Sequence, residues 1–211
     1  MPRAPRSFFE GTAEKLAPRL IGCTLVRVLD GERLSGRIVE VEAYAGIKDT
    51  ASHAYNGRRG QKNEAMYARA GMSYVYFTYG MHFCMNIVCG EVDEPLAVLL
   101  RALEPTEGLE IMRRLRAGAR AKPLRDRDLC SGPGKLCHAF AITREQNLID
   151  LTTSREIFLE VPTTAPPARF LARTPRIGIG SGHGWADRPL RWVLKGNPHV
   201  SVPVRSAARK K

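Results

Sequence analysis

The stretch GRIVEVEAYA, residues 36–45, constrains the fold most strongly, because it places two glutamates inside an apolar run. Side chains on a β-strand alternate between the two faces of a sheet, so Glu40, Glu42 and Tyr44 share one face. The intervening valines and alanine share the other face, which we expect to be the core. The glutamate-bearing face is then either a solvated outer surface, the commoner fate of glutamate on a strand, or a site of chemistry.

The rest of the chain predicts short elements of both kinds. Strands are predicted at 23–29, 36–45, 73–89 (a hairpin with Gly80 at its turn), 96–103, 155–161, 176–180 and 190–196. Helices are predicted at 10–22 with Thr12 as N-cap, at 104–118 with Pro105 in its first turn, and after a loop with Pro133 near the start. Residues 46–73 read as a long functional loop. We therefore expect a mixed α/β (α+β) domain with a curved, largely antiparallel sheet and a protruding β-hairpin.

Length and charge limit the organisation and the partners. The 211 residues fit one domain over 1–205, followed by a basic tail at 206–211 that we expect to be disordered. The net charge of +12 favours a polyanionic partner, first of all nucleic acid. The chain contains no apolar run of about 18 residues and no signal-peptide pattern, so we expect a soluble, cytoplasmic protein without membrane contact.

Metal and cofactor signals are weak. The five cysteines follow no zinc-ligand spacing, and we expect reduced thiols with neither a metal nor a cofactor. The paired H-x-E and P-C-x-x-C motifs of zinc nucleobase deaminases do not occur. GIGSGHG, residues 178–184, does not have the G-x-G-x-x-G spacing of a dinucleotide site.

Aromatic residues gather around the predicted hairpin turn, where polar residues are usual. Tyr74 and Tyr76 share a strand face, and Tyr79 falls at the turn. In a basic protein, an apolar tip suggests a wedge that enters the DNA base stack, while the rings on the strand line a pocket. The alternative is a hairpin folded back onto the core with its rings buried.

Two further polar residues stand out in apolar surroundings. Arg101 is a single charge in the run LAVLLRAL and needs a carboxylate partner, for which Glu42 is the obvious candidate. The arrangement would also fit an ordinary structural ion pair. Asn86 ends the run HFCMN and is either a turn former or a reader of base edges. Together with the wedge, these features fit an enzyme that flips a base out of DNA.

Five long stretches carry a family resemblance: GRIVEVEAYAG, YVYFTYGMHFCMNI, VLLRALEPTEGLEIMRRLR, DLCSGPGKLCHAFAI and RIGIGSGHGWADRPLRW. They resemble the alkyladenine DNA glycosylases, also called mammalian-type 3-methyladenine DNA glycosylases. The resemblance implies a single-domain fold and a monofunctional hydrolase. The small size suggests a bacterial, nucleoid-associated member of the family. A monomer is the default expectation, because nothing in the sequence indicates oligomerisation.

The resemblance further implies residue roles. Glu42 matches the general base that activates water, and Arg101 matches the residue that helps to hold this water. The base pocket is implied to contain Tyr44, His53, Tyr76 and Asn86, with the backbone near Ile179 and Gly180 supplying a carbonyl. The DNA wedge and backbone contacts are implied to be Tyr79, Met81, His82 and Lys135.

The implied reaction is removal of alkylated or deaminated purines, namely 3-methyladenine, 7-methylguanine, hypoxanthine and ethenoadenine, from duplex DNA at the start of base excision repair. Tyr79 would enter from the minor-groove side. The alternative is a non-catalytic minor-groove binder that distorts DNA, which would need Tyr79 but not Glu42. A rival enzyme mechanism would use Pro2, exposed after removal of Met1, as an amine nucleophile.

Overall fold

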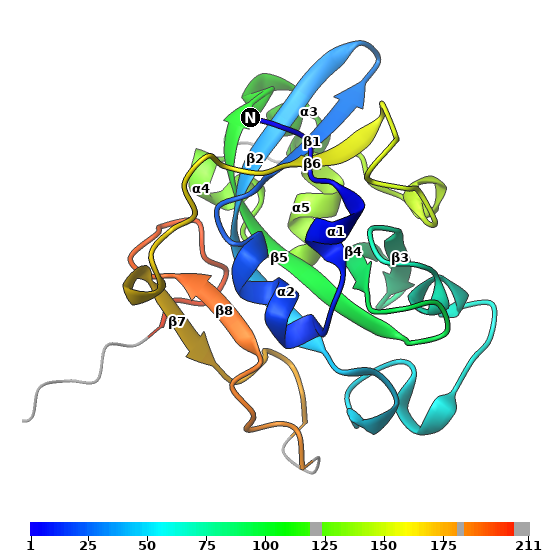
Figure 1. Ribbon diagram of the computed structural model, residues 1–211. Coiled ribbons are helices and arrows are strands. Elements are labelled where there is room, and N and C mark those ends of the chain that lie inside the picture. The colour runs from blue at the N-terminus through cyan, green and yellow to red at the C-terminus, as the bar shows by residue number, and fades with distance from the viewer. Residues whose placement is uncertain (119–123, 181–183, 205–211) are drawn as a thin grey trace, which may run out of the picture.

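The computed structural model describes residues 1–118, 124–180 and 184–204 (Figure 1). These residues form an eight-stranded sheet with the order β3-β4-β5-β2-β1-β6, and β8 pairs with both β2 and β7. All of these strand pairs are antiparallel. The strands are β1 (Thr24–Leu29), β2 (Glu32–Tyr44), β3 (Ser73–Thr78), β4 (His82–Cys89), β5 (Leu96–Glu107), β6 (Ile157–Glu160), β7 (Leu171–Thr174) and β8 (Arg191–Leu194). The expected mixed α/β fold with a largely antiparallel sheet is confirmed.

The sheet bends at the middle of β2. The first half of β2 pairs with β1, whereas residues 40–42 pair with β8. On its other edge β2 pairs with β5, and register shifts flank Glu40 in this pairing. A β-bulge bends its strand and increases the local twist, and bulges are frequent next to active sites. Glu40 and Glu42 therefore lie where the sheet changes direction.

Helices cover both faces of the sheet. In Figure 1, α2 lies in front of the sheet and α5 lies behind it. Leu16 and Leu20 of α2 and Leu136 of α5 are fully buried in the main core. Glu40 and Glu42 are both 0% exposed, so the interpretation of the glutamate-bearing face as a solvated surface is wrong.

The helices are short: α1 (Arg6–Phe9), α2 (Ala13–Leu20), α3 (Leu109–Ala117), α4 (Asp126–Leu129) and α5 (Pro133–Ala139). Thr12 caps α2 by accepting a hydrogen bond from the Lys15 amide, and Pro133 begins α5, as expected. The expected helix start at Pro105 is wrong. Strand β5 continues to Glu107 because its pairing with β2 includes Pro105 opposite Gly36.

Helix α3 instead begins after Gly108, which has a φ of 74°. A Cβ at this position would lie 2.9 Å from Cγ of Leu34, so both the conformation and the close approach require glycine. The expected strand at 176–180 is also wrong. Those residues form no strand pairs, and the strand in this region is β7, which precedes them.

The hairpin of β3 and β4 is confirmed. Tyr79 and Gly80 at its turn both have positive φ, 52° and 67°. The Tyr79 side chain is 85% exposed and that of Met81 is 69% exposed, so the tip projects into solvent. The strand rings behind it are covered, since Tyr74 is buried and Tyr76 is half-buried.

The loop between β2 and β3 contains three short 3₁₀ helices: η1 (Gly46–Lys48), η2 (Tyr55–Gly57) and η3 (Glu64–Tyr67). Two more, η4 (Arg144–Gln146) and η5 (Ala168–Phe170), precede β6 and β7. The five cysteines are buried and form no disulfide.

Within the described ranges, no cluster of three or more His, Cys, Asp or Glu side chains is placed to hold a metal ion. No helix in this part of the chain has the length and apolar character needed to cross a bilayer. The basic tail at 206–211 lies outside the described residues.

Candidate active site

A buried charged cluster lies between β2, β5 and β8, and it consists of Glu40, Glu42, Arg101 and Arg191. Both glutamates are 0% exposed. Arg101 faces them from β5 and Arg191 from β8, and both arginine side chains are almost completely buried. Burying a charge is costly unless it is paired and hydrogen-bonded, so this cluster depends on its mutual contacts.

Glu42 is held by two hydrogen bonds and one ion pair. Its Oε1 accepts a hydrogen bond from the backbone N–H of Ile177 at 2.7 Å. Its Oε2 accepts from the Tyr44 hydroxyl at 3.2 Å and lies 3.2 Å from Nη1 of Arg101. Burial raises the pKa of Glu42, while the charge of Arg101 and the Ile177 N–H oppose this rise.

Arg101 contacts both glutamates, which extends the expected pairing with Glu42 alone. Its Nε donates to Oε1 of Glu40 at 2.9 Å, while Nη1 reaches Glu42. Arg191 donates from Nε to the same Glu40 oxygen at 2.7 Å. The sequence correctly predicted that Arg101 has a carboxylate partner. It did not predict that the guanidinium of Arg101 contacts two carboxylates.

A cleft of about 330 Å³ opens next to the groups that contact Glu42, although Glu42 itself does not line it. Tyr44, Arg101 and Ile177, the three residues that bind the Glu42 carboxylate, all line this cleft. The remaining lining residues are Ala51, His53, Tyr76, Thr78, Tyr79, Cys84, Leu99, Pro133, Gly178, Ile179 and Gly180. The structure thus brings most of the expected site residues to one opening.

Aromatic rings form one wall of this opening. The ring centroids of His53 and Tyr76 are 4.5 Å apart with an edge-to-face angle of 78°. Nδ1 of His53 and the Tyr74 hydroxyl share a hydrogen bond of 2.7 Å. Tyr44, His53, Tyr76 and Asn86 border a small adjoining cavity of about 50 Å³. Asn86 donates to the backbone oxygen of Tyr74 at 3.1 Å, so it is fixed in place at this wall.

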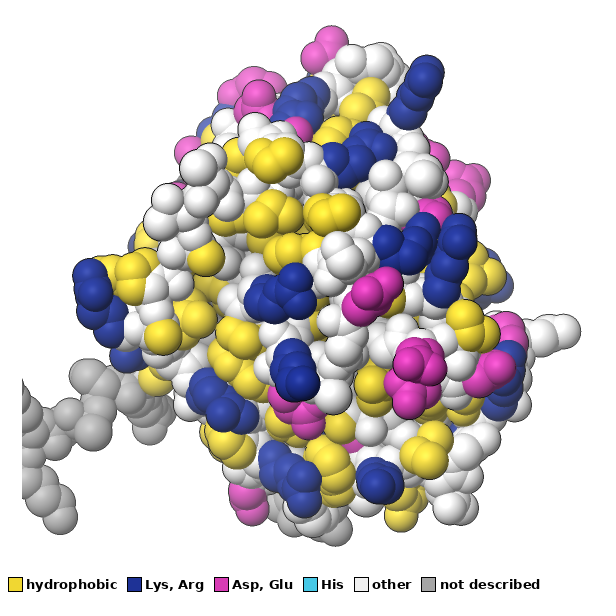
Figure 2. Space-filling view, viewed as in Figure 1, with side chains coloured by type: hydrophobic (Ala, Val, Ile, Leu, Met, Phe, Trp, Pro, Cys, Tyr) yellow, Lys and Arg dark blue, Asp and Glu magenta, His cyan; other side chains and the backbone are white. Residues whose placement is uncertain are grey.

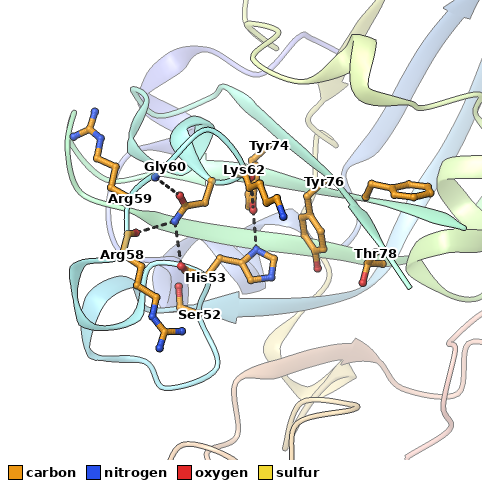
Figure 3. Close-up of a pocket in the computed structure, with 11 residues that line it drawn as sticks. Ser52, His53, Arg58, Arg59, Gly60, Lys62, Tyr74, Tyr76 and Thr78 are labelled. Carbon is orange, nitrogen blue, oxygen red and sulfur yellow. Dashed lines mark hydrogen bonds between the residues drawn. The ribbon is translucent and has the colours of Figure 1, made fainter. Parts of the chain in front are cut away.

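The loop that carries His53 is held by buried polar side chains. Asn63 donates to the backbone oxygens of His53 and Arg58 and accepts from the Gly60 amide. Figure 3 shows His53 extending from this loop towards Tyr74 and Tyr76, with the hydrogen bond to Tyr74 dashed. Partial burial lowers the pKa of His53, although the residue as a whole is exposed.

A second cleft, of about 470 Å³, borders the same rings and is drawn in Figure 3. It contains three basic residues, Arg58, Arg59 and Lys62. On the face seen in Figure 2, basic side chains are spread over the surface and are separated by hydrophobic ones. Net charge alone therefore does not locate a binding surface, whereas this cleft concentrates basic groups next to the rings.

The expected wedge residues lie at one end of the molecule. Tyr79 borders the cleft together with Pro133 of α5. His82 packs against the start of α5. Its ring lies so close to Gly134 that a Cβ added to this glycine would be 3.0 Å from the ring. Lys135 is exposed on the same helix. The hairpin tip and the start of α5 therefore form one surface around the cleft.

Four residues of this region have no role in the sequence-based site: Glu40, Asp49, Arg176 and Arg191. Arg191 could have been found by the signal that singled out Arg101, since it is also a lone charge in an apolar run, LRWVL. Asp49 and Arg176 lie in polar or glycine-rich stretches, where nothing in the sequence predicts burial. They are nevertheless fully buried and bonded to each other.

Comparison with known proteins connects this geometry to a family. The family model for methylpurine-DNA glycosylase matches residues 7–198. The chain is 44% identical over 205 residues to a DNA-3-methyladenine glycosylase of Homo sapiens, covering 95% of this chain and 68% of that protein. It is 46% identical over 200 residues to a Burkholderia lata protein provisionally named 3-methyladenine DNA glycosylase, covering 95% and 91%. The chain belongs to the methylpurine-DNA glycosylase family.

Proposed function

We propose that this chain is a monofunctional DNA glycosylase that releases alkylated and deaminated purines from duplex DNA. Its family and the names of its relatives support the enzyme class and 3-methyladenine as a substrate. We extend the substrates to 7-methylguanine, hypoxanthine and ethenoadenine. In this proposal residues 1–205 act as one domain and as a monomer, without a cofactor.

The arrangement around Glu42 carries the proposal. A carboxylate offers about four acceptor sites, and the described residues give Glu42 two hydrogen bonds, from Ile177 and Tyr44, and an ion pair with Arg101. Capacity for one more donor remains beside the cleft, and a water molecule fits that need. Glu42 in its ionised form then takes a proton from this water as the water oxygen bonds to the sugar carbon. The bond from this carbon to the purine nitrogen breaks, and the purine leaves with the electron pair, while Arg101 holds the water and the carboxylate in place.

The aromatic wall supports binding of a flipped purine. Tyr44 and Tyr76 supply ring faces, and His53 lies against Tyr76 at 4.5 Å. Cationic bases such as 3-methyladenine gain cation–π attraction from electron-rich rings, and they are also good leaving groups. Asn86, fixed at the small cavity, would crowd the 2-amino group of normal guanine. Neutral lesions such as hypoxanthine depend more on the enzyme.

The exposed hairpin tip supports the expected mode of DNA binding. Tyr79 and Met81 project from a strained turn next to the cleft, as an intercalating wedge requires. In the proposal Tyr79 enters from the minor-groove side and fills the space left by the flipped nucleotide. Lys135 and His82 contact the DNA backbone at the same end.

A hydrolytic mechanism is favoured over an amine nucleophile at Pro2. The Pro2 backbone oxygen accepts a hydrogen bond from Val161, just after β6. Strand β6 lies at the opposite edge of the sheet from β3, which carries the aromatic wall. We therefore expect no strand cleavage and no borohydride-trapped adduct with DNA.

The decisive experiment compares base release by the wild type and by Glu42→Gln. A duplex with one hypoxanthine and a methylated duplex are incubated with excess enzyme, and abasic sites are then cut by heat and alkali. We expect the substitution to slow release about 10²- to 10⁴-fold, the usual effect of removing a general base. Binding to the lesion-containing duplex should persist in the variant.

Two results would contradict the proposal. Equal release by the variant and the wild type would exclude Glu42 as the base. Lesion binding by both proteins without release from either duplex would favour the non-catalytic, DNA-distorting binder.

The wedge is tested separately with Tyr79→Ser. The exposed side chain has little to contribute to folding, so the thermal unfolding temperature should stay unchanged. Affinity for a lesion-containing duplex should fall by about 1–3 kcal/mol, the usual value for stacking of a base on an aromatic ring. Unchanged affinity and unchanged base release would remove Tyr79 from the proposal.

A further inference from the structure

Asp49 and Arg176 form a buried ion pair behind the site. Nη1 of Arg176 donates to Oδ2 of Asp49 at 2.5 Å, and Nη2 donates to Oδ1 at 2.8 Å. Both side chains are 0% exposed. Such two-pronged contacts fix direction as well as distance, since the guanidinium and the carboxylate are both planar.

The pair ties three segments together. Arg176 also donates to the backbone oxygen of Ala43 at the end of β2, and its guanidinium lies 4.6 Å from the ring centroid of Tyr44. Asp49 accepts hydrogen bonds from the backbone amides of Ala45 and Ala51, at both sides of η1. The end of β2, the start of the His53 loop and the segment after β7 therefore share one fixed point.

The segment after β7 has no other regular framework. Residues 175–180 form neither a helix nor a strand, yet the amide of Ile177 lies 2.7 Å from Oε1 of Glu42. Ile177 directly follows Arg176, so the position of the guanidinium sets the position of this amide. The same guanidinium holds the ring of Tyr44, whose hydroxyl is another donor to Glu42.

We propose that Asp49 and Arg176 are positioning residues for base excision, because they hold the Ile177 amide and the Tyr44 ring in the places where both bind Glu42. This inference rests on the proposed role of Glu42 as the base. Neither residue lines the cleft, and both side chains are bonded to each other and to backbone groups, so neither is expected to touch the substrate. Their effect passes entirely through the geometry and ionisation of Glu42.

The pKa of Glu42, which the Asp49–Arg176 pair is proposed to influence, also depends on the charged and titratable groups that face this carboxylate. They are Glu40 and Tyr44 from β2, Arg101 from β5, Cys84 from β4 and Arg191 from β8. The Ile177 N–H adds a donor that favours the ionised carboxylate. Loss of this donor raises the pKa of Glu42. As the pH is lowered, the rate of base release therefore begins to fall at a higher pH than in the wild type.

The test uses Arg176→Lys in the full chain. Lysine keeps the charge but cannot bind both carboxylate oxygens and Ala43 in one plane. We expect the single-turnover rate at pH 7 to fall about tenfold, as for a small misplacement of a reacting group, with unchanged affinity for lesion-containing DNA. The acidic limb of the pH–rate profile should move to higher pH.

Arg6→Lys is the matched control. Arg6 also binds a carboxylate, Asp150, and a backbone oxygen, that of Ala70, far from the cleft. It should leave the pH–rate profile unchanged and lower the thermal unfolding temperature by less, because the side chains of Arg6 and Asp150 are 28% and 15% exposed, whereas those of Arg176 and Asp49 are 0% exposed. Asp49→Asn, assayed at a temperature where circular dichroism shows it folded, provides a second variant with the same expected shift.

A direct titration separates this inference from the proposed function. Glutamate carboxyl carbons labelled with ¹³C are followed by NMR, and the Glu42 signal is assigned by its loss in Glu42→Gln. An upward shift of the Glu42 titration in Arg176→Lys supports the inference even if the wild type releases no base. A Glu42 titration identical to that of the wild type would overturn it, whatever the activity shows.

Discussion

The two glutamates of β2 occupy the same face of one strand, two residues apart, and both are completely buried. Four donors converge on Glu40: Nε of Arg101, Nε of Arg191, and the amide and hydroxyl of Ser201. Glu42 receives two hydrogen bonds and one ion pair from the described residues, and the three groups that make these contacts border a cleft. Glu40 is therefore saturated, whereas Glu42 can accept one more hydrogen bond.

The difference arises from what covers each carboxylate. Residues near the end of the described chain close over Glu40, through Ser201. The segment after β7 reaches Glu42 only through a backbone amide and leaves the cleft beside it open. Burial by itself thus does not distinguish the two carboxylates, whereas the number and kind of their contacts do, and this difference is why we propose Glu42 as the base.

Substitution of Glu40 should have the largest effect on stability. Glu40→Gln leaves Arg101 and Arg191 without the charge that they share, and breaking a buried pair typically costs about 3–5 kcal/mol. Urea unfolding measures this loss. Well below the unfolding temperature, base release should stay closer to the wild-type rate than in Glu42→Gln. A variant as stable as the wild type would remove the distinction between the two glutamates.

A smaller effect is expected from Tyr44→Phe, which removes one donor from Glu42 and none from Glu40. Loss of a hydrogen bond worth about 1 kcal/mol should slow base release up to about tenfold. The acidic limb of the pH–rate profile should move upward, because the ionised carboxylate loses a donor. Single-turnover kinetics over a range of pH measures both changes. A pH profile that does not move would show that this hydroxyl has no influence on the ionisation of Glu42.

The smallest effect concerns the pH dependence of stability in Glu42→Gln. Burial raises the pKa of Glu42 above its ordinary value of 4.5. Relative to Glu42→Gln, the wild type is therefore most stable below pH 4.5, where Glu42 is protonated in both the folded and the unfolded state. It loses this relative stability as the pH rises through the raised pKa of the folded protein. Thermal unfolding should show the variant gaining a few degrees relative to the wild type over that interval. A difference that is constant with pH would contradict the raised pKa.

Local patterns identified most of the secondary structure and several site residues. Alternation placed Glu42 and Tyr44 on one face of a strand, and the lone charge in an apolar run identified Arg101. The predicted helix start at Pro105 was wrong because β5 continues through this residue. A strand tolerates proline at a position where the neighbouring strand needs no hydrogen bond from its amide. The strand at 176–180 was wrong because those residues are held by side-chain contacts of Arg176 and by the Glu42 carboxylate.

The sequence by itself determined most of the elements, the hairpin and the residue types needed for the proposed chemistry, since these depend on neighbours within a few positions. Only the tertiary structure decided that Arg101 serves two glutamates, that Arg191 and Ser201 saturate Glu40, and that Asp49 fixes Arg176 behind Glu42. Asp49 and Arg176 are separated by 127 residues along the chain. Their contact is set by the packing of three segments around β2, a long-range arrangement that no local pattern encodes.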